Sequence, residues 1–249
     1  MEIGEQISPV SISTLLSIIM FGQVEYYNHF GKLNKTAILT CAEPELWTTD
    51  YNEKGRIYTE MLERIRHQTF LIEQFFSNNH SVLDAGCGFG RQAMILAKKG
   101  FSVVGVDSSQ IFIELAAELF ERHHLRARFL RGDLMELSLP QFPQVILFDV
   151  LEHINPSARK IFLEKLHALS LQDATLIVSV PHLKKRFTSI LNNKLRKKIT
   201  QHFSYFLGRE EHPYPIPTPA EVTRLTNGLF TILKFEQTPV TDYYVLRKL

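Results

Sequence analysis

The stretch SVLDAGCGFGRQ, at residues 81–92, places three glycines within five positions, after an apolar run and before a helical pattern. Glycine accepts left-handed backbone conformations and lets another group approach the backbone closely. In an open α/β sheet, a glycine-rich turn from the first strand to the first helix lies at the carboxyl edge, where ligands bind. The stretch therefore predicts a parallel α/β fold with a ligand-binding turn at Gly86, Gly88 and Gly90.

Short β-branched runs alternate with helical patterns between residues 81 and 180, which is typical of a parallel sheet with crossover helices. The expected strands are residues 81–85, 102–107, 127–131, 145–150 and 175–180, with a terminal hairpin at 230–236 and 243–247. The expected helices are residues 57–76, 91–99, 109–123 and 156–169, and a last helix from Thr218 to near Gly228. Ser109, Asn155 and Thr218 are the expected N-terminal caps, because their side-chain oxygens accept hydrogen bonds from a first helical turn.

Composition and charge restrict the possible functions. With 249 residues, 45% of them hydrophobic and 22% charged, the chain can bury one large core together with a small lid. The net charge of +2 gives no general attraction to nucleic acid. Cys41 and Cys87 lie far apart, so neither a disulfide framework nor a zinc site is expected, and the reducing cytoplasm fits best. The apolar run 7–22 lacks the basic start of a signal peptide and is expected to be a buried or lid helix.

The spacing of the glycines narrows the kind of ligand. A dinucleotide fingerprint needs G-x-G-x-x-G, whereas the third glycine here comes one residue earlier, and no Gly-Lys-Ser/Thr follows as in a phosphate-binding loop. Of these ligand types, a nucleoside-type cofactor remains.

Asp107 ends the second expected strand, where its carboxylate can accept hydrogen bonds from both ribose hydroxyls. Asp133 follows the third strand and can accept from an adenine amino group, with Leu134 over the ring. Asp84 either orders the glycine turn or reaches an amino group through water.

Four successive motifs, VLDAGCGFGR, VVGVD, RGDL and ILFDVLEHI, resemble those of the class I S-adenosylmethionine-dependent methyltransferases, over residues 57–249. The fourth motif, with the later LIVSVPH, is most similar to the small-molecule branch that includes ubiquinone-type O-methyltransferases. The resemblance implies a Rossmann-like, doubly wound seven-stranded sheet, mostly parallel with an antiparallel last strand. It also implies S-adenosylmethionine as cofactor and methyl transfer to a small-molecule or lipid-like acceptor, at an oxygen, nitrogen or carbon. The cofactor contacts it implies are Asp84, Ala85, Gly86, Cys87, Gly88, Gly90, Asp107, Ser108, Asp133, Leu134 and Asp149.

His153 is the candidate catalytic residue, since it follows the fourth strand and an imidazole can take a proton near neutral pH. The alternative is a hydrogen-bonded structural histidine. A metal site is a second alternative, because a helical turn here would put Asp149, Glu152 and His153 on one face, where His212 could close it. The aspartate at the first position shortens the reach of that ligand, so no metal is expected.

Two flanking segments are expected to shape the acceptor site. Residues 1–56 should form a helical cap, whose aromatic residues either line the acceptor pocket or pack in a core: Tyr26, Tyr27, Phe30, Trp47 and Tyr51. Residues 182–217 form an insertion, with seven basic and no acidic residues from 184 to 198 at the spacing of an amphipathic helix. This insertion is expected to be a substrate lid. It can contact a membrane surface or an acidic or lipid-like substrate, whereas contact with nucleic acid is disfavoured. It can also be a lid whose lysines are merely solvated.

Three other functions remain open from the sequence. The chain can be an RNA or protein methyltransferase, or a non-catalytic protein that binds the cofactor as a scaffold. A nicotinamide oxidoreductase is disfavoured by the glycine spacing.

Overall fold

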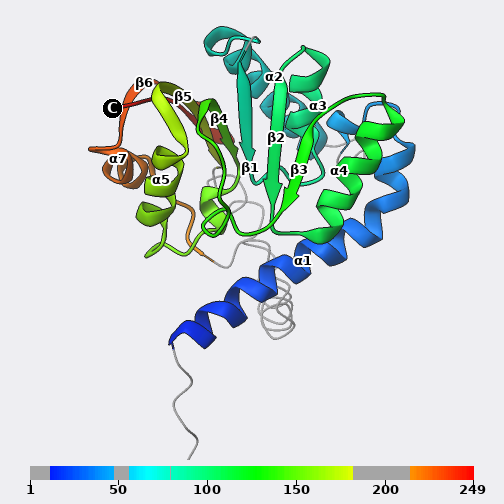
Figure 1. The fold of residues 1–249 in the computed structure, drawn as a ribbon, viewed down its shortest axis with the longest axis horizontal. Coiled ribbons are helices and arrows are strands. Elements are labelled where there is room, and N and C mark those ends of the chain that lie inside the picture. Colours follow the sequence, from blue (N-terminus) through cyan, green and yellow to red (C-terminus); the bar gives the residue numbers. More distant parts are fainter. Residues whose placement is uncertain (1–11, 48–55, 79, 182–213) are drawn as a thin grey trace, which may run out of the picture.

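The computed structural model describes residues 12–47, 56–78, 80–181 and 214–249 (Figure 1). In this part of the chain seven strands form one sheet in the order β3-β2-β1-β4-β5-β7-β6. The strands are β1 (Ser81–Ala85), β2 (Ser102–Asp107), β3 (Arg128–Arg131), β4 (Phe142–Phe148), β5 (Ser170–Pro181), β6 (Phe230–Gln237) and β7 (Thr241–Lys248). β1 to β5 are parallel, and β7 pairs antiparallel with both β5 and β6. The expected seven-stranded sheet with an antiparallel last strand is confirmed.

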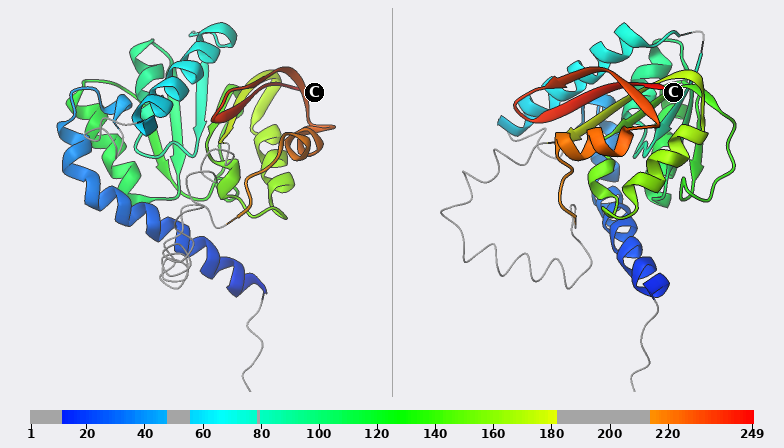
Figure 2. Two further views of the ribbon diagram at one scale, coloured as in Figure 1. Left: turned by 180° about the vertical axis from the view of Figure 1, so that it is seen from behind. Right: turned by 90° about the vertical axis from the view of Figure 1, so that its left-hand side faces the viewer.

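Helices cover both faces of the sheet (Figure 2). The helices are α1 (Ile12–Thr40), α2 (Arg56–Phe75), α3 (Arg91–Lys98), α4 (Gln110–Arg122), α5 (Arg159–Ala168) and α7 (Pro219–Thr226). Helices α2, α3 and α4 pack on one face, and α5 and α7 on the other. Two short 3₁₀ helices, η1 (Pro44–Leu46) and η2 (Leu151–His153), lie in the connections.

The central strands β1 and β4 are buried on both faces, which explains why consecutive residues such as Val82 and Leu83, and 145–148, are apolar. Leu83, Val145 and Leu147 face the α5 side of the sheet, while Val82 and Ile146 face the α2 side. Each such side chain contributes about 1.5–3 kcal/mol by leaving water. The sheet thus holds the carboxyl ends of four parallel strands in fixed positions.

Helix α1 runs past the carboxyl edge of the sheet and then along α4 (Figure 1). Asn28 binds the start of α4, because its Oδ1 accepts from Ser109 Oγ at 2.8 Å and from Ile111 N at 3.3 Å. Ile38 and Trp47 belong to the same buried cluster as the α2 face of the sheet. The described residues of the predicted cap, 12–47, therefore share a core with the sheet. No helix among the described residues is long and apolar enough to cross a membrane.

The start of α5 differs from the prediction. The helix was expected to begin at Pro156 with Asn155 as its cap, but it begins at Arg159. Asn155 forms a local turn instead, since its Oδ1 accepts from Ser157 N at 3.0 Å and its carbonyl from Ala158 N at 2.8 Å. By contrast, the caps at Ser109 and Thr218 are confirmed by bonds from Phe112 N and Glu221 N, both 3.2 Å long.

Candidate functional site

The glycine turn has the left-handed backbone that the sequence suggests. Gly86, Gly88 and Gly90 have φ values of 80°, 52° and 83°. A Cβ at Gly86 would lie 2.4 Å from Cγ2 of Val150, and one at Gly90 would lie 3.2 Å from Phe129. Glycine is therefore required here by backbone conformation and by close packing of the turn against neighbouring elements, in addition to any ligand that approaches it.

Asp107 at the end of β2 holds this turn in place. Its Oδ2 accepts from Gly88 N at 2.9 Å, and its Oδ1 accepts from Ser109 N at 2.8 Å. Burial raises the pKa of the Asp107 carboxyl, whereas the hydrogen bonds from the backbone N–H groups of Ser109 and Gly88 act in the opposite direction. The carboxylate thus joins the glycine turn to the start of α4.

Asp84 lies beneath the turn and is only 3% exposed. Burial raises its pKa to about 7, with a further increase from Asp107, while a hydrogen bond from the backbone of Ala93 opposes them. Its Oδ2 is buried and has no hydrogen-bond partner among the described residues. A buried oxygen of this kind favours a ligand that brings a donor or a positive charge.

A cavity of about 280 Å³, here termed the glycine-loop cavity, opens at the carboxyl ends of β1, β2, β3 and β4. The predicted site residues that line it are Gly86, Gly88, Asp107, Ser108, Asp133, Leu134, Asp149 and His153. Four further predicted contacts, Asp84, Ala85, Cys87 and Gly90, do not line it. The sequence did not single out Gln23, Val24, Val150 and Phe162, which also line it.

Asp133 and Cys87 have clear structural surroundings. Asp133 Oδ1 accepts from Met135 N at 2.9 Å, which orders the turn after β3. Cys87 is buried, and burial raises the pKa of its thiol well above the ordinary value, with Asp84 and Asp107 adding to the effect. A thiol of this kind is unreactive. Cys87 is therefore suited to a packing role only.

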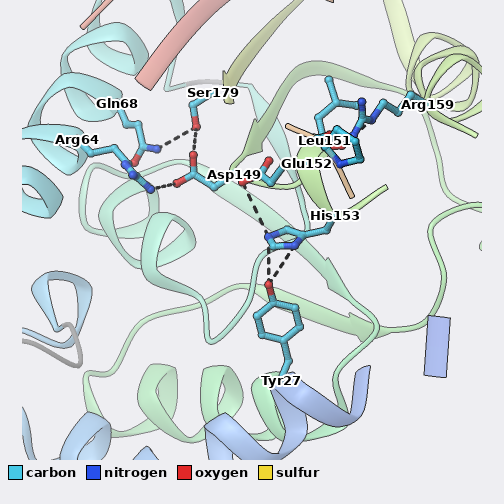
Figure 3. A network of polar contacts seen from close by, with 10 residues as sticks. Tyr27, Arg64, Gln68, Asp149, Leu151, Glu152, His153, Arg159 and Ser179 are labelled. Atoms are coloured by element: carbon cyan, nitrogen blue, oxygen red, sulfur yellow. Dashed lines mark hydrogen bonds and ion pairs between the residues drawn. The ribbon is translucent and has the colours of Figure 1, made fainter. Parts of the chain in front are cut away.

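Asp149 stands where β4 ends, in a left-handed conformation with φ of 56° (Figure 3). Its Oδ2 accepts from Arg64 Nη1 at 2.7 Å, and its Oδ1 accepts from Ser179 Oγ at 2.8 Å. Gln68 of α2 donates to Ser179 at 3.2 Å. The carboxylate is thus held by side chains of α2 and β5, so its side chain serves mainly to position the backbone at this point.

The metal alternative gains no support from this geometry. Among the described residues no group of three His, Cys, Asp or Glu side chains could hold a metal ion. Glu152 is fully buried, and burial together with Asp149 raises the pKa of its carboxyl well above the ordinary value. A carboxyl group whose neutral form is favoured is a poor metal ligand. His212 lies outside the described residues.

His153 faces the glycine-loop cavity from η2 and contacts Tyr27 of α1 (Figure 3). The Tyr27 hydroxyl lies 3.0 Å from Nε2 and 3.3 Å from Nδ1 of His153, and the rings are perpendicular with centroids 5.6 Å apart. Trp47, in contrast, is 5% exposed and packs edge-on against Phe30 and Phe89. Of the N-terminal aromatic residues, Tyr27 therefore belongs to the cavity and Trp47 to the core, while Tyr51 lies outside the described residues.

Sequence reasoning missed Arg64, Ser179 and Gln68. Arg64 lies 85 positions before Asp149 along the chain, and Tyr27 lies 126 positions before His153. A local pattern carries no information about such distant pairs. The only available signal was that arginine and glutamine occur on the apolar side of the helical repeat in residues 57–76.

The contact between Gly86 and Val150 yields a test with a matched control. Gly86→Ala should lower the free energy of unfolding by about 2–4 kcal/mol, from left-handed strain plus overpacking. Gly100→Ala should lower it by only about 1 kcal/mol, because Gly100 has a φ of 86° but nothing within 4 Å of an added Cβ. Denaturant titration measures both. Adding Val150→Ala to Gly86→Ala should recover part of the loss, and equal losses for the two glycine variants would contradict the packing argument.

The pKa of Asp84 yields a second test. An acid whose pKa is raised on folding stabilises the fold below its unfolded pKa, and this contribution is lost as the pH rises through the folded pKa. Asp84→Asn should therefore gain stability over the wild type between about pH 4 and pH 7, by up to about 4 kcal/mol. Thermal unfolding at several pH values measures this. The exposed Asp173→Asn should show no such trend, and a pH-independent difference for Asp84→Asn would refute the assignment.

Comparison with known proteins agrees with the site geometry. Residues 82–171 match a family model described as a methyltransferase domain. A carboxy-S-adenosyl-L-methionine synthase of Hydrogenovibrio crunogenus is 29% identical over 102 residues, which cover 39% of this chain and 41% of that protein. A ubiquinone biosynthesis O-methyltransferase of Rickettsia akari is 33% identical over 92 residues, covering 34% of this chain and 37% of that protein. The chain thus spans about two-fifths of the length of these curated relatives.

A solved structure shares the fold over nearly the whole chain. Magnesium protoporphyrin IX methyltransferase from Synechocystis PCC 6803, solved with bound S-adenosylmethionine, superposes with a TM-score of 0.67 at 16% sequence identity. The match covers 98% of this chain and 100% of that one. Residues 82–171 therefore match a methyltransferase domain, and the chain shares the fold of a solved S-adenosylmethionine-dependent methyltransferase.

Proposed function

We propose that the protein transfers a methyl group from S-adenosylmethionine to a small-molecule or lipid-like acceptor. The observation that carries this proposal is the glycine-loop cavity, which brings Gly86, Asp107 and Asp133 from three strand ends to one place. Each of these groups suits a different part of the cofactor. Their convergence is hard to explain by packing alone, because two of the three are carboxylates beside a cavity.

The residues fit the cofactor part by part. Asp107 and Ser108 line the cavity and can accept from ribose hydroxyls, and Asp133 with Leu134 can hold the adenine. The glycine turn allows close approach of the ribose and methionine portions. Asp84 does not line the cavity, so its carboxyl would act on the methionine portion through the glycine turn or through a bridging water. When bound, the cofactor supplies a methyl group activated by a sulfonium.

For methyl transfer itself, the protein mainly has to place the acceptor atom in line with the methyl–sulfur bond of the cofactor and to exclude water. Where the acceptor is protonated, we assign His153 as the base, because it lines the cavity beside the end of β4. The contact of Tyr27 with both ring nitrogens gives this histidine a defined orientation. Tyr27 is accordingly a positioning residue in this scheme, and α1 contributes to the site.

Three finer points belong to the proposal. The two cysteines are free, which supports a cytoplasmic location.

We retain the division into a cap (1–56), a methyltransferase domain (57–249) and an inserted lid (182–217). Peripheral contact with an anionic membrane is proposed for residues 184–198, on the basis of their sequence alone, since they lie outside the described residues. RNA or protein acceptors, or a scaffold role, gain no observation in their favour.

Calorimetric titration with S-adenosylhomocysteine tests the cofactor assignment. The wild type should bind it saturably and should not bind NADH. Asp107→Asn should weaken binding by about tenfold or more, because an amide accepts less strongly from ribose hydroxyls than a carboxylate. Asp173→Asn, at an exposed position near the start of β5, is the matched control and should bind like the wild type. Binding of NADH alone, or wild-type affinity in Asp107→Asn, would overturn the assignment.

The role of His153 is tested by kinetics with tritiated S-adenosylmethionine and the best acceptor from a panel of phenols. His153→Ala should lower kcat by about a hundredfold and remove the acidic limb of its pH profile, with little change in S-adenosylhomocysteine affinity. Tyr27→Phe should shift that limb and lower kcat less, since it perturbs the base without removing it. His123→Ala is the control. An unchanged kcat in His153→Ala would show that His153 is not the base. Absence of turnover in the wild type and in every variant would instead indicate a scaffold role.

A further inference from the structure

A second cavity, of about 400 Å³, lies between α2 and the turn that joins β6 to β7. We term it the hairpin cavity. The turn lies at the carboxyl edge of the sheet, because Thr241 at the start of β7 pairs with Pro181 at the end of β5. The hairpin cavity and the glycine-loop cavity therefore open at the same edge of the sheet.

The two cavities meet at one ion pair. Arg64 lines the hairpin cavity, and Asp149 lines the glycine-loop cavity. The guanidinium and the carboxylate are 2.7 Å apart. Figure 3 shows the pair between α2 and the end of β4. A compound in the hairpin cavity would thus lie next to the end of β4.

The walls of the hairpin cavity suit a ring. Tyr243 forms part of the wall and is 1% exposed, with the His67 ring packed on it at a centroid distance of 4.4 Å. Phe70 and Val240 complete an apolar lining on either side. Phe70 is 44% exposed, with the Lys234 ammonium 5.7 Å from its ring centroid, and so part of its ring surface remains open to a ligand. Aromatic and aliphatic walls with few polar groups are typical of sites for flat organic ligands.

The charged groups around the hairpin cavity favour an anion. Arg64 keeps its charge, because the neighbouring Asp149 raises its pKa further, and its Nε is buried with no hydrogen-bond partner among the described residues. Arg66 adds a second guanidinium at the rim. Three acids face this region: Asp149, which is paired with Arg64; Glu63, which lines the cavity; and Glu236, which lies 2.7 Å from His67 and 2.8 Å from Lys234. Glu236 is thus matched by its own neighbours.

We propose that the hairpin cavity is a binding site for an aromatic carboxylate, separate from the glycine-loop cavity. The ring lies against Tyr243 and Phe70, and the carboxylate is bound by Arg66 at the rim and by the unused Nε–H of Arg64. This binding does not depend on the proposed function.

The test uses 1-naphthoate as the probe and neutral 1-naphthalenemethanol as its uncharged counterpart. The affinity for each compound is measured by ligand-detected NMR on the full chain saturated with S-adenosylhomocysteine. The wild type should bind naphthoate at least about fivefold more tightly than the alcohol. Arg66→Glu should weaken naphthoate binding about fivefold or more and leave the alcohol unchanged. Arg126→Glu, in the loop before the opposite edge strand β3, is the charge-matched control and should affect neither.

Val240→Trp fills the hairpin cavity and should abolish binding of both probes while S-adenosylhomocysteine affinity stays within about twofold. Its melting temperature shows whether the variant is folded, and Thr238→Leu, at the same turn, provides a milder filling substitution. Equal affinity for the two probes, or naphthoate binding that survives Val240→Trp and Thr238→Leu, overturns the proposal. Failure of the wild type to bind S-adenosylhomocysteine would refute the proposed function instead. The two failures can be distinguished, because naphthoate binding is measured in a separate titration.

Discussion

The carboxylate of Asp149 is the interaction on which the arrangement of the site depends. It joins three elements that are distant in sequence: α2 through Arg64, β5 through Ser179, and the end of β4 itself. Gln68 extends the network, donating to Ser179 and accepting from Gln92 of α3. Charges withdrawn from water are tolerated only when paired and hydrogen-bonded, and removal of one partner leaves the other uncompensated. The pair thus fixes both the left-handed backbone at Asp149 and the wall between the two cavities.

A second buried charge holds the segment that follows. Arg159 is completely buried and donates to the carbonyls of Leu151, the first residue of η2, and of Ile154, which directly follows η2. Its Nη1 also pairs with Glu221 of α7 at 2.7 Å. Because η2 carries His153, the orientation of that imidazole depends on a guanidinium six residues further along the chain. Glu221 has two roles, because its backbone N–H donates to the Thr218 cap while its carboxylate forms this tertiary pair.

The local features of the fold were predictable, and the reasons can be stated for particular residues. β1 and β2 match the expected strands residue for residue, because apolar runs bounded by glycine and a helix cap leave little freedom. The glycine turn and Asp107 follow from their position at a strand end. The start of α5 was wrong, since Asn155 can cap either a turn or a helix and its sequence is compatible with both. Arg64 and Tyr27 could not be placed in the site, because tertiary packing alone brings them to Asp149 and His153.

The electrostatics of the site follow from this packing. The pKa of Asp84 is set mainly by burial and by the like charge of Asp107, two carboxylates that share the floor of the glycine turn. Burial raises the pKa of Glu152 as well, and it lowers the pKa of Arg91 to about 10 with help from Arg64. The two cavities nevertheless differ in the charged groups that line them. Asp107 and Asp133 line the glycine-loop cavity, whereas Arg64 and Arg66 line the hairpin cavity. The fold thus places, on the two sides of Asp149, a site lined by carboxylates that suits a sulfonium and a site with two guanidiniums that suits an anion.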